Sequence, residues 1–332
     1  NMGLKKSEHL SKIIVHPKNS NIVWVASQGP LWSSGGERGV YKTIDGGKTW
    51  TQTLGDSEWI GATDLLIDPR NPNHLYAATW QRHRTVAGYM GGGPGTGIYK
   101  STDGGENWQE LKKGLPKSNM GKIGLVLSPQ NSDVIYAAIE LDRRTGGVYK
   151  SIDQGANWKK MSDAVAGGTG PHYYQELYAS PHNEGEIYLA DNYMQVSYDG
   201  GKTFVRMNET EKHVDNHAVA FKMSDPNYIL VGCDGGLYES FDRTKNWKFV
   251  DNLPLTQFYK IAVDDAKPFY NVFGGTQDNN TQGAPSRTDN IHGIRNSDWF
   301  IVLGGDGHQP ATEPGNPNIV YAQWQRGNLN RH

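Results

Sequence analysis

His213, Asp215 and His217 recur at every second position of one short segment. Side chains two residues apart point to the same face of a β-strand, so a strand here would bring two imidazoles and a carboxylate together. Such a set can transfer protons in general acid–base catalysis, and it can also bind a divalent metal ion. The same side chains could instead hydrogen-bond loop carbonyls and hydroxyls. We leave these alternatives open and assign no metal or other cofactor.

Several aspartates stand in loop-like segments downstream of this cluster or within it. Glycoside hydrolysis needs two carboxyl groups about 5–9 Å apart, one of which is kept protonated. Glycines flank Asp234 and Asp306, so aspartates that only cap turns are the competing interpretation. The sequence does not select a pair. The catalytic candidates are Asp215, His217, Asp278, Asp306 and Asp234.

Aromatic and polar side chains of the loops are candidates for substrate binding. Aromatic faces can stack on the C–H edges of sugar rings, although ordinary packing is an equal alternative for each ring. The binding candidates are Trp80, Arg82, His83, Tyr173, Tyr174, His213, Gln277 and Trp299, and further candidates are Tyr89, Trp324 and His172. Arginines can also hold an anion bidentately, or can simply be solvated. The arginines in question are Arg82, Arg84, Arg143 and Arg144.

A repeated turn pattern indicates the elements that must position these residues. The first copy reads Thr43-Ile-Asp45-Gly-Gly47-Lys-Thr-Trp50, and four more begin at Ser101, Ser151, Ser197 and Ser240. The copies recur at a spacing close to the length of about 45 residues that is typical of a four-stranded propeller blade. The hydroxyl and carboxylate can bond backbone N–H groups, glycine accepts positive φ, and the aromatic ring can pack under the turn. We therefore assign these turns a structural role.

Short apolar strands surround each turn, in the order strand A, strand B, strand C, turn, strand D. Strand A recurs near residues 13, 64, 123, 176, 217 and 259, and a seventh unit ends after a strand B at 318–322. The pattern predicts an all-β propeller of four-stranded blades, with about six full blades and a partial seventh, and seven blades when complete. We expect one domain over residues 1–332 that is a fragment of a longer chain. The candidate residues fall in the B–C loops and D-to-A connections, which lie opposite the turns.

The repeated turns resemble Asp-box (BNR) repeats, which occur in sialidases, xyloglucan-cleaving glycoside hydrolases and sortilin. A narrower resemblance is to large secreted bacterial proteins described as BNR-repeat glycosyl hydrolases or sortilin-like proteins. The motifs that carry it are His213-Val-Asp-Asn-His217, Gly275-Thr-Gln-Asp-Asn279, Gly304-Gly-Asp-Gly307 and residues 318–325. The chain lacks the Arg-Ile-Pro segment of sialidases, and the aspartate motifs of xyloglucanases are not intact. The resemblance therefore implies a propeller and a secreted or cell-surface location, but it transfers no catalytic residue.

Composition excludes several other classes of function. There are 33 Lys and Arg against 35 Asp and Glu, so no basic excess is available to neutralise nucleic acid. No apolar run of about 18 residues is present, which predicts no membrane span. Cys233 is the only cysteine, so an internal disulfide framework is excluded.

Together these features favour an extracellular propeller that binds a polysaccharide or glycan, with glycoside hydrolysis by paired carboxylates as the associated chemistry. The alternatives are a sortilin-like module that binds peptide or protein, and a scaffold domain without catalysis. A scaffold would contact a protein partner or missing parts of the same chain. A carboxyl pair at hydrolytic spacing would favour the enzyme, and an apolar patch without such a pair would favour the binding module.

Overall fold

The computed structural model describes residues 2–55, 57–142, 145–167, 173–253 and 255–332. Contacts divide the chain into a first unit, Asn1–Phe249, and a second unit, Val250–His332. The expectation of a single domain over residues 1–332 stays a prediction. Within the described ranges, no helix has the length and hydropathy that crossing a bilayer requires.

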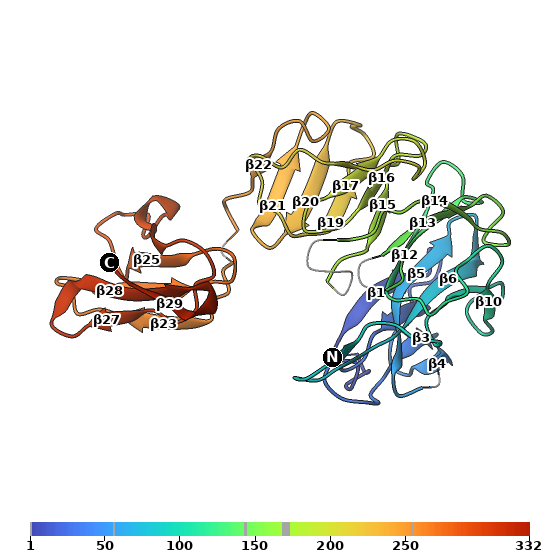
Figure 1. The fold of residues 1–332 in the computed structure, drawn as a ribbon, viewed down its shortest axis with the longest axis horizontal. Helices are drawn as coiled ribbons and strands as arrows, with labels where there is room; N and C mark the ends of the chain where they lie inside the picture. Colours follow the sequence, from blue (N-terminus) through green and yellow to red (C-terminus); the bar gives the residue numbers. More distant parts are fainter. Residues whose placement is uncertain (1, 56, 143–144, 168–172, 254) are drawn as a thin grey trace. The chain divides into compact units, whose positions relative to one another are not determined.

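The first unit consists of five successive four-stranded antiparallel sheets, here called sheets I to V. In Figure 1 their strands follow one another along the chain from blue to yellow. Sheet I contains β1 (Leu10–Val15), β2 (Val23–Ser27), β3 (Gly39–Thr43) and β4 (Thr51–Leu54). Sheet II contains β5 (Ile60–Asp68), β6 (Asn71–Gln81), β9 (Ile98–Ser101) and β10 (Gln109–Leu111), and its loop forms the hairpin β7 (His83–Arg84) and β8 (Tyr89–Met90).

The remaining three sheets of this unit repeat the same order. Sheet III contains β11 (Ile123–Leu127), β12 (Ile135–Glu140), β13 (Gly146–Ser151) and β14 (Lys159–Ser162). Sheet IV contains β15 (Leu177–Ala179), β16 (Ile187–Leu189), β17 (Gln195–Ser197) and β18 (Val205–Arg206). Sheet V contains β19 (Asn216–Phe221), β20 (Ile229–Cys233), β21 (Gly236–Ser240) and β22 (Lys248–Phe249).

The second unit adds a four-stranded sheet VI and a three-stranded sheet VII. Sheet VI contains β23 (Lys260–Val263), β24 (Asn271–Gly275), β25 (Thr281–Pro285) and β26 (Phe300–Leu303). Sheet VII contains β27 (Ala311–Glu313), β28 (Asn316–Trp324) and β29 (Asn328–Arg331), and the 3₁₀ turns are η1 (Asn296–Asp298) and η2 (Gln325–Gly327). This confirms the all-β propeller with six full blades and a partial seventh. The prediction that the seventh unit ends after its strand B was wrong, because a third strand, β29, follows β28. The count of seven blades in a complete ring stays a prediction.

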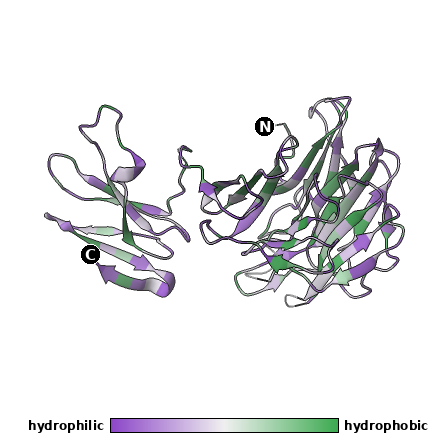
Figure 2. Ribbon diagram, turned by 90° about the horizontal axis from the view of Figure 1, so that it is seen from above, coloured by the Kyte–Doolittle hydropathy of each residue, from purple (hydrophilic) through white to green (hydrophobic). Residues whose placement is uncertain are grey.

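The core of the first unit lies between successive sheets. Alternate residues of a strand point to opposite faces, and β12 illustrates this. Ile135 and Ile139 join the buried cluster shared with sheet II, whereas Tyr136 and Ala138 join the cluster shared with sheet IV. The apolar residues accordingly concentrate on the strands, as the green segments of Figure 2 show. The middle strands are thus buried on both faces, which explains their continuous apolar runs.

The five repeated turns, here called the Asp turns, connect the third and fourth strands of sheets I to V and confirm the structural role assigned to them. In the first, the Thr43 hydroxyl accepts the N–H of Gly47 at 3.0 Å. The Asp45 carboxylate accepts the N–H of Thr49 at 2.9 Å, and Gly47 has a φ of 86°. A Cβ on Gly47 would lie 3.5 Å from the ring of Trp50, so the ring does pack against the turn. Thr244 fills the glycine position of the fifth turn with a φ of 69°.

This topology sets where the candidate site forms. Because the strands are antiparallel and the Asp turns join the third strand to the fourth, the second-to-third loops and the connections between sheets lie at the opposite ends of the strands. In sheets IV and V these segments contain Tyr174, Asn192, Asp215 and Asp234.

Candidate functional site

Asp215 is at the centre of a polar cluster formed by sheets IV and V. Its side chain is largely buried, and its Oδ1 accepts the hydroxyl proton of Tyr174 at 2.8 Å. The side-chain amide of Asn192 donates to the same oxygen. The Asp215 N–H also donates to the Asn192 carbonyl at 2.7 Å. Two neutral donors from the preceding sheet therefore fix this carboxylate.

His217 and Asp234 form the exposed half of the cluster. The Nε2 of His217 lies 2.9 Å from Oδ1 of Asp234, and both side chains are more than one third exposed. The His217 ring stacks on Tyr174 with a centroid distance of 5.2 Å. Oxygen atoms of the Asp215 and Asp234 carboxylates lie within 4.8 Å of one another. The cluster thus combines a fixed, buried carboxylate with a solvent-accessible imidazole–carboxylate pair.

The strand argument that led to these residues was wrong in its geometry. Asp215 has a φ of 63°, in the left-handed region that is costly for a residue with a side chain. Strand β19 begins only at Asn216, so His213 and Asp215 precede it and do not share a strand face with His217. Asp215 and His217 still share a neighbour, because Tyr174 donates to the Asp215 carboxylate and stacks on the His217 ring.

His213 turns toward Cys233 and its own backbone rather than toward a common metal position. Its Nδ1 lies 2.8 Å from the Val214 carbonyl oxygen and 3.9 Å from Oδ2 of Asp215. A hydrogen bond with the Cys233 thiol, helped by the Val214 carbonyl and the Asp215 charge, raises the pKa of His213 to about 9. Over the described part of the chain, His213, Asp215 and His217 do not form a group whose ligand atoms converge on one point.

A buried ionic network, which sequence reasoning missed, holds the segment before β19. Lys212 donates to Glu209 at 2.8 Å and to Oδ1 of Asn216 at 2.6 Å. The Asn216 amide in turn donates to Glu209 at 2.8 Å and to the Asn192 carbonyl at 3.2 Å. Paired and hydrogen-bonded charges of this kind tolerate burial. The network connects the segment before β19 to the loop of sheet IV. The spacing of these residues in the sequence gives no sign of it.

Glu140, at the end of β12, stands among the polar residues that the sequence places at the B–C loop of the third blade, but it was assigned no catalytic or binding role. Burial raises its pKa to about 7, and its carboxylate accepts the N–H of Lys122 at 3.1 Å. A carboxyl group with such a pKa can donate a proton near neutral pH. Only the packing around the side chain produces this shift, so the sequence alone carried no signal for it.

The candidate residues in the loop of sheet II pack against other parts of the protein. Trp80 is 1% exposed and donates its indole N–H to the Gly91 carbonyl at 2.8 Å, so it presents no free face to a sugar. Arg82 is also buried, stacks on Trp80 and donates to the Gly29 carbonyl at 3.2 Å. His83 packs edge-on against Trp59, with ring centroids 4.2 Å apart. Arg143, Arg144 and His172 lie outside the described residues.

The second unit contains the remaining candidates. Asp306 accepts the backbone N–H of Asp278 at 2.7 Å, and Gln277 accepts the hydroxyl proton of Tyr259. Trp299 is partly exposed and stacks against Phe258 with ring centroids 6.0 Å apart. The predicted residues that the structure describes thus belong to three parts of the chain: the cluster of sheets IV and V, the loop of sheet II, and the second unit.

Three solved structures are similar to this chain. The GH74 enzyme of Niastella koreensis has a TM-score of 0.57 and 17% identity, over 96% of this chain and 48% of that chain. A GH74 xyloglucanase from Xanthomonas campestris has a TM-score of 0.42 and 14% identity, over 95% of this chain and 53% of that one. YCF48 bound to D1 peptide has a TM-score of 0.49 and 15% identity, over 99% and 93%.

The low identities and partial coverage limit what these similarities show about this chain. At such identities the likeness to the Niastella koreensis enzyme shows the β-propeller fold alone, and this chain spans about half the length of the first two GH74 enzymes. No protein-family model matches the chain. No curated protein matches it either.

Proposed function

We propose that this chain is a propeller that binds a polysaccharide at the cluster of sheets IV and V and hydrolyses it with Asp215 and Asp234. The single observation that carries the proposal is the pair of carboxylates with oxygens within 4.8 Å of each other. Retaining glycosidases use carboxyl groups about 5 Å apart, whereas inverting ones need about 6.5–9.5 Å to admit a water. The spacing therefore favours retention of configuration at the sugar carbon.

The two carboxylates have different surroundings, which suits them to different roles. Asp215 accepts hydrogen bonds from Tyr174 and Asn192, so its negative charge is stabilised where a sugar carbon would develop positive charge. Asp234 is exposed and bonded to His217, so this pair can deliver a proton to the leaving oxygen and later take one from water. Hydrolysis thereby breaks one C–O bond and adds the elements of water across it.

Exposed aromatic rings beside the cluster support a sugar substrate. Tyr173 is 51% exposed and lies 6.3 Å, centroid to centroid, from the ring of Tyr174. Tyr193 follows Asn192 directly, but the Arg206 guanidinium covers one face of its ring. A pair of carboxylates beside an exposed aromatic ring matches the amphipathic surface of a sugar, while a peptide-binding module needs no such pair. The proposal also implies a secreted or cell-surface protein, because polysaccharides of this kind lie outside cells.

Replacement of Asp234 tests the proposal directly. Wild-type protein and the Asp234→Asn variant would be assayed for reducing ends released from xyloglucan, xylan, mannan, cellulose and pectin. We expect the variant to lose at least about 100-fold in rate on the polysaccharide that wild type cleaves, since general acid–base catalysis contributes about 10²–10⁴-fold. Because Asp234 is exposed, the fold should be retained, which circular dichroism can check.

Asp163→Asn is the matched control, because Asp163 is an exposed aspartate of the same unit that is paired with Lys160. It should keep the wild-type rate. If no polysaccharide is bound or cleaved while a peptide binds to the wild-type protein, the peptide-binding alternative holds and the proposal is wrong.

A further inference from the structure

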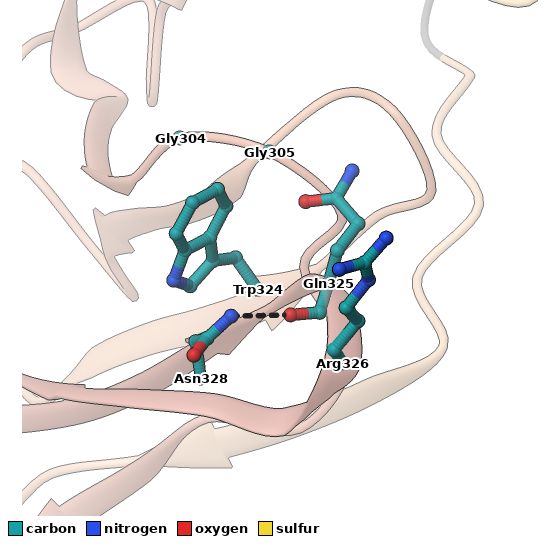
Figure 3. Close-up of a pocket in the computed structure, with 6 residues that line it drawn as sticks. All are labelled: Gly304, Gly305, Trp324, Gln325, Arg326 and Asn328. Atoms are coloured by element: carbon teal, nitrogen blue, oxygen red, sulfur yellow. Dashed lines mark hydrogen bonds between the residues drawn. The ribbon is translucent and has the colours of Figure 1, made fainter.

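A pocket in the second unit has a composition that the proposed site does not explain. Trp324, Gln325, Arg326 and Asn328 line one side of it, and Gly304 and Gly305 line the other, with a volume of about 590 Å³. Figure 3 shows the Trp324 indole beneath the Gly304–Gly305 backbone, with the Gln325 and Arg326 side chains beside it. The volume lies within the range of about 300–1,000 Å³ that small-ligand sites occupy.

The backbone of this pocket is held in a specific conformation. The side-chain amide of Asn328 donates to the Gln325 carbonyl at 2.8 Å, which closes the turn η2. Gln325 accepts the N–H of Asp306 at 3.1 Å through its side chain and so ties the two walls together. Gly305 has a φ of 98°, and a Cβ there would lie 2.6 Å from the Gln325 side-chain oxygen. The positive φ favours glycine at this position, and a side chain there would have to displace the Gln325 amide.

A second pocket continues from the first around the same turn. Trp324, Gln325 and Arg326 line both, and the second, of about 500 Å³, adds Tyr259, Asp306 and His308 on its far side. The shared residues therefore stand between two adjacent pockets.

The chemistry of the shared residues is specific. Trp324 is 45% exposed, so an indole face is available for stacking. The Arg326 guanidinium makes no hydrogen bond or ion pair with any residue that the structure describes, and it is the single charged lining residue of the first pocket. A guanidinium matches a carboxylate with two parallel hydrogen bonds. The negative Asp306 lines only the second pocket, where His308 accompanies it.

We infer that the first pocket binds a uronic acid residue, with its ring on Trp324 and its carboxylate on Arg326. This inference rests on the proposed function and narrows it, because it makes the polysaccharide an acidic one. The Gln325 side-chain amide can donate to the sugar hydroxyls. A neutral sugar would leave the Arg326 charge without a partner, so the pocket discriminates between neutral and acidic residues.

The test measures binding of two probes to the full chain by isothermal titration calorimetry, with a galacturonic acid hexamer as the acidic probe and a xylose hexamer as the neutral one. We expect the acidic hexamer to bind at least about 10-fold more tightly. Arg326→Gln should abolish that preference, and Trp324→Ala should weaken binding of the acidic hexamer at least about 10-fold. Arg331→Gln is the matched control, because Arg331 is exposed in β29 outside both pockets, and it should bind as wild type does.

The outcomes separate this inference from the proposed function. If the acidic hexamer binds no better than the neutral one, or if its affinity is unchanged in Arg326→Gln and Trp324→Ala, the inference is overturned. Cleavage of a neutral polysaccharide together with absence of uronate binding would remove the inference and leave the proposed function standing. Absence of both binding and cleavage on every polysaccharide would remove both.

Discussion

Asp215 adopts a left-handed backbone conformation that costs on the order of 1 kcal/mol or more for a residue with a side chain. Its hydrogen bonds from Tyr174 and Asn192, and its backbone bond to the loop of sheet IV, hold it there. A strained backbone conformation persists only where the surrounding contacts hold it in place. Such residues concentrate at functional sites. The contacts that hold this conformation also fix the direction of the Asp215 carboxylate, which the proposed function requires.

His213 provides a prediction at the same scale. Its pKa is raised to about 9 chiefly through the hydrogen bond with Cys233, so Cys233→Ala should return the pKa toward the usual value near 6.5. NMR titration of the imidazole protons measures this directly. Because the folded-state pKa is the higher one, the associated stability is fully present below about pH 6.5 and is lost as the pH rises through about 9. An unchanged titration midpoint in the variant would rule out the thiol as the cause.

At the scale of elements, the Asp turns should control acid stability. Hydrogen bonds from the side chain and backbone N–H of Thr49 and from the Thr43 hydroxyl hold the pKa of Asp45 well below its usual range, and the same arrangement lowers the pKa of Asp103. A lowered folded-state pKa gives stability that is present above the unfolded pKa near 4 and lost as the pH falls below it.

Thermal unfolding followed by circular dichroism tests this. Asp45→Asn should lower the Tm by several degrees at pH 7, because the amide cannot reproduce the charged acceptor, and the difference from wild type should shrink toward pH 2. Asp163→Asn, outside the turns, should unfold as wild type does. Equal Tm values for Asp45→Asn and wild type at pH 7 would contradict the role of the turns.

The contacts between sheets supply the other prediction at this scale. Ile135 is fully buried in the cluster between sheets II and III, so Ile135→Ala should lower the free energy of unfolding by about 2–5 kcal/mol. Ile152→Ala, in an exposed position of an Asp turn, should change it by less than about 0.5 kcal/mol. Urea unfolding measures both values. Similar values for the two variants would mean that Ile135 does not pack in the core as described.

At the scale of the whole molecule, the repeats made the fold predictable from the sequence. Each blade is a local unit of four consecutive strands, so spacing, turn residues and apolar runs suffice to predict the order of the blades and to place the first strand of each full blade approximately. The strand β29 was not predicted, because Asn328–Arg331 has neither a turn motif nor an apolar run.

The site was predictable only in part. His217, at the start of β19, and Asp234, in the loop between β20 and β21, stand at the ends of neighbouring strands that the blade pattern places together. The left-handed turn at Asp215 and the Lys212–Glu209 network depend instead on contacts between sheets. Trp80 and Arg82 look like binding residues in the sequence, and only the folded chain reveals that they are buried. Residue type and loop position therefore identify the neighbourhood of a site, while tertiary packing decides which side chains remain accessible.

The central claim is that Asp215 and Asp234 act together on a polysaccharide. The most direct measurement is a crystal structure of the Asp234→Asn variant with an oligosaccharide of the polysaccharide that wild type cleaves. The account predicts a sugar unit within hydrogen-bonding distance of both Asp215 and residue 234, with a ring stacked on Tyr173. An oligosaccharide bound away from both residues, or full cleavage activity in the variant, would contradict it.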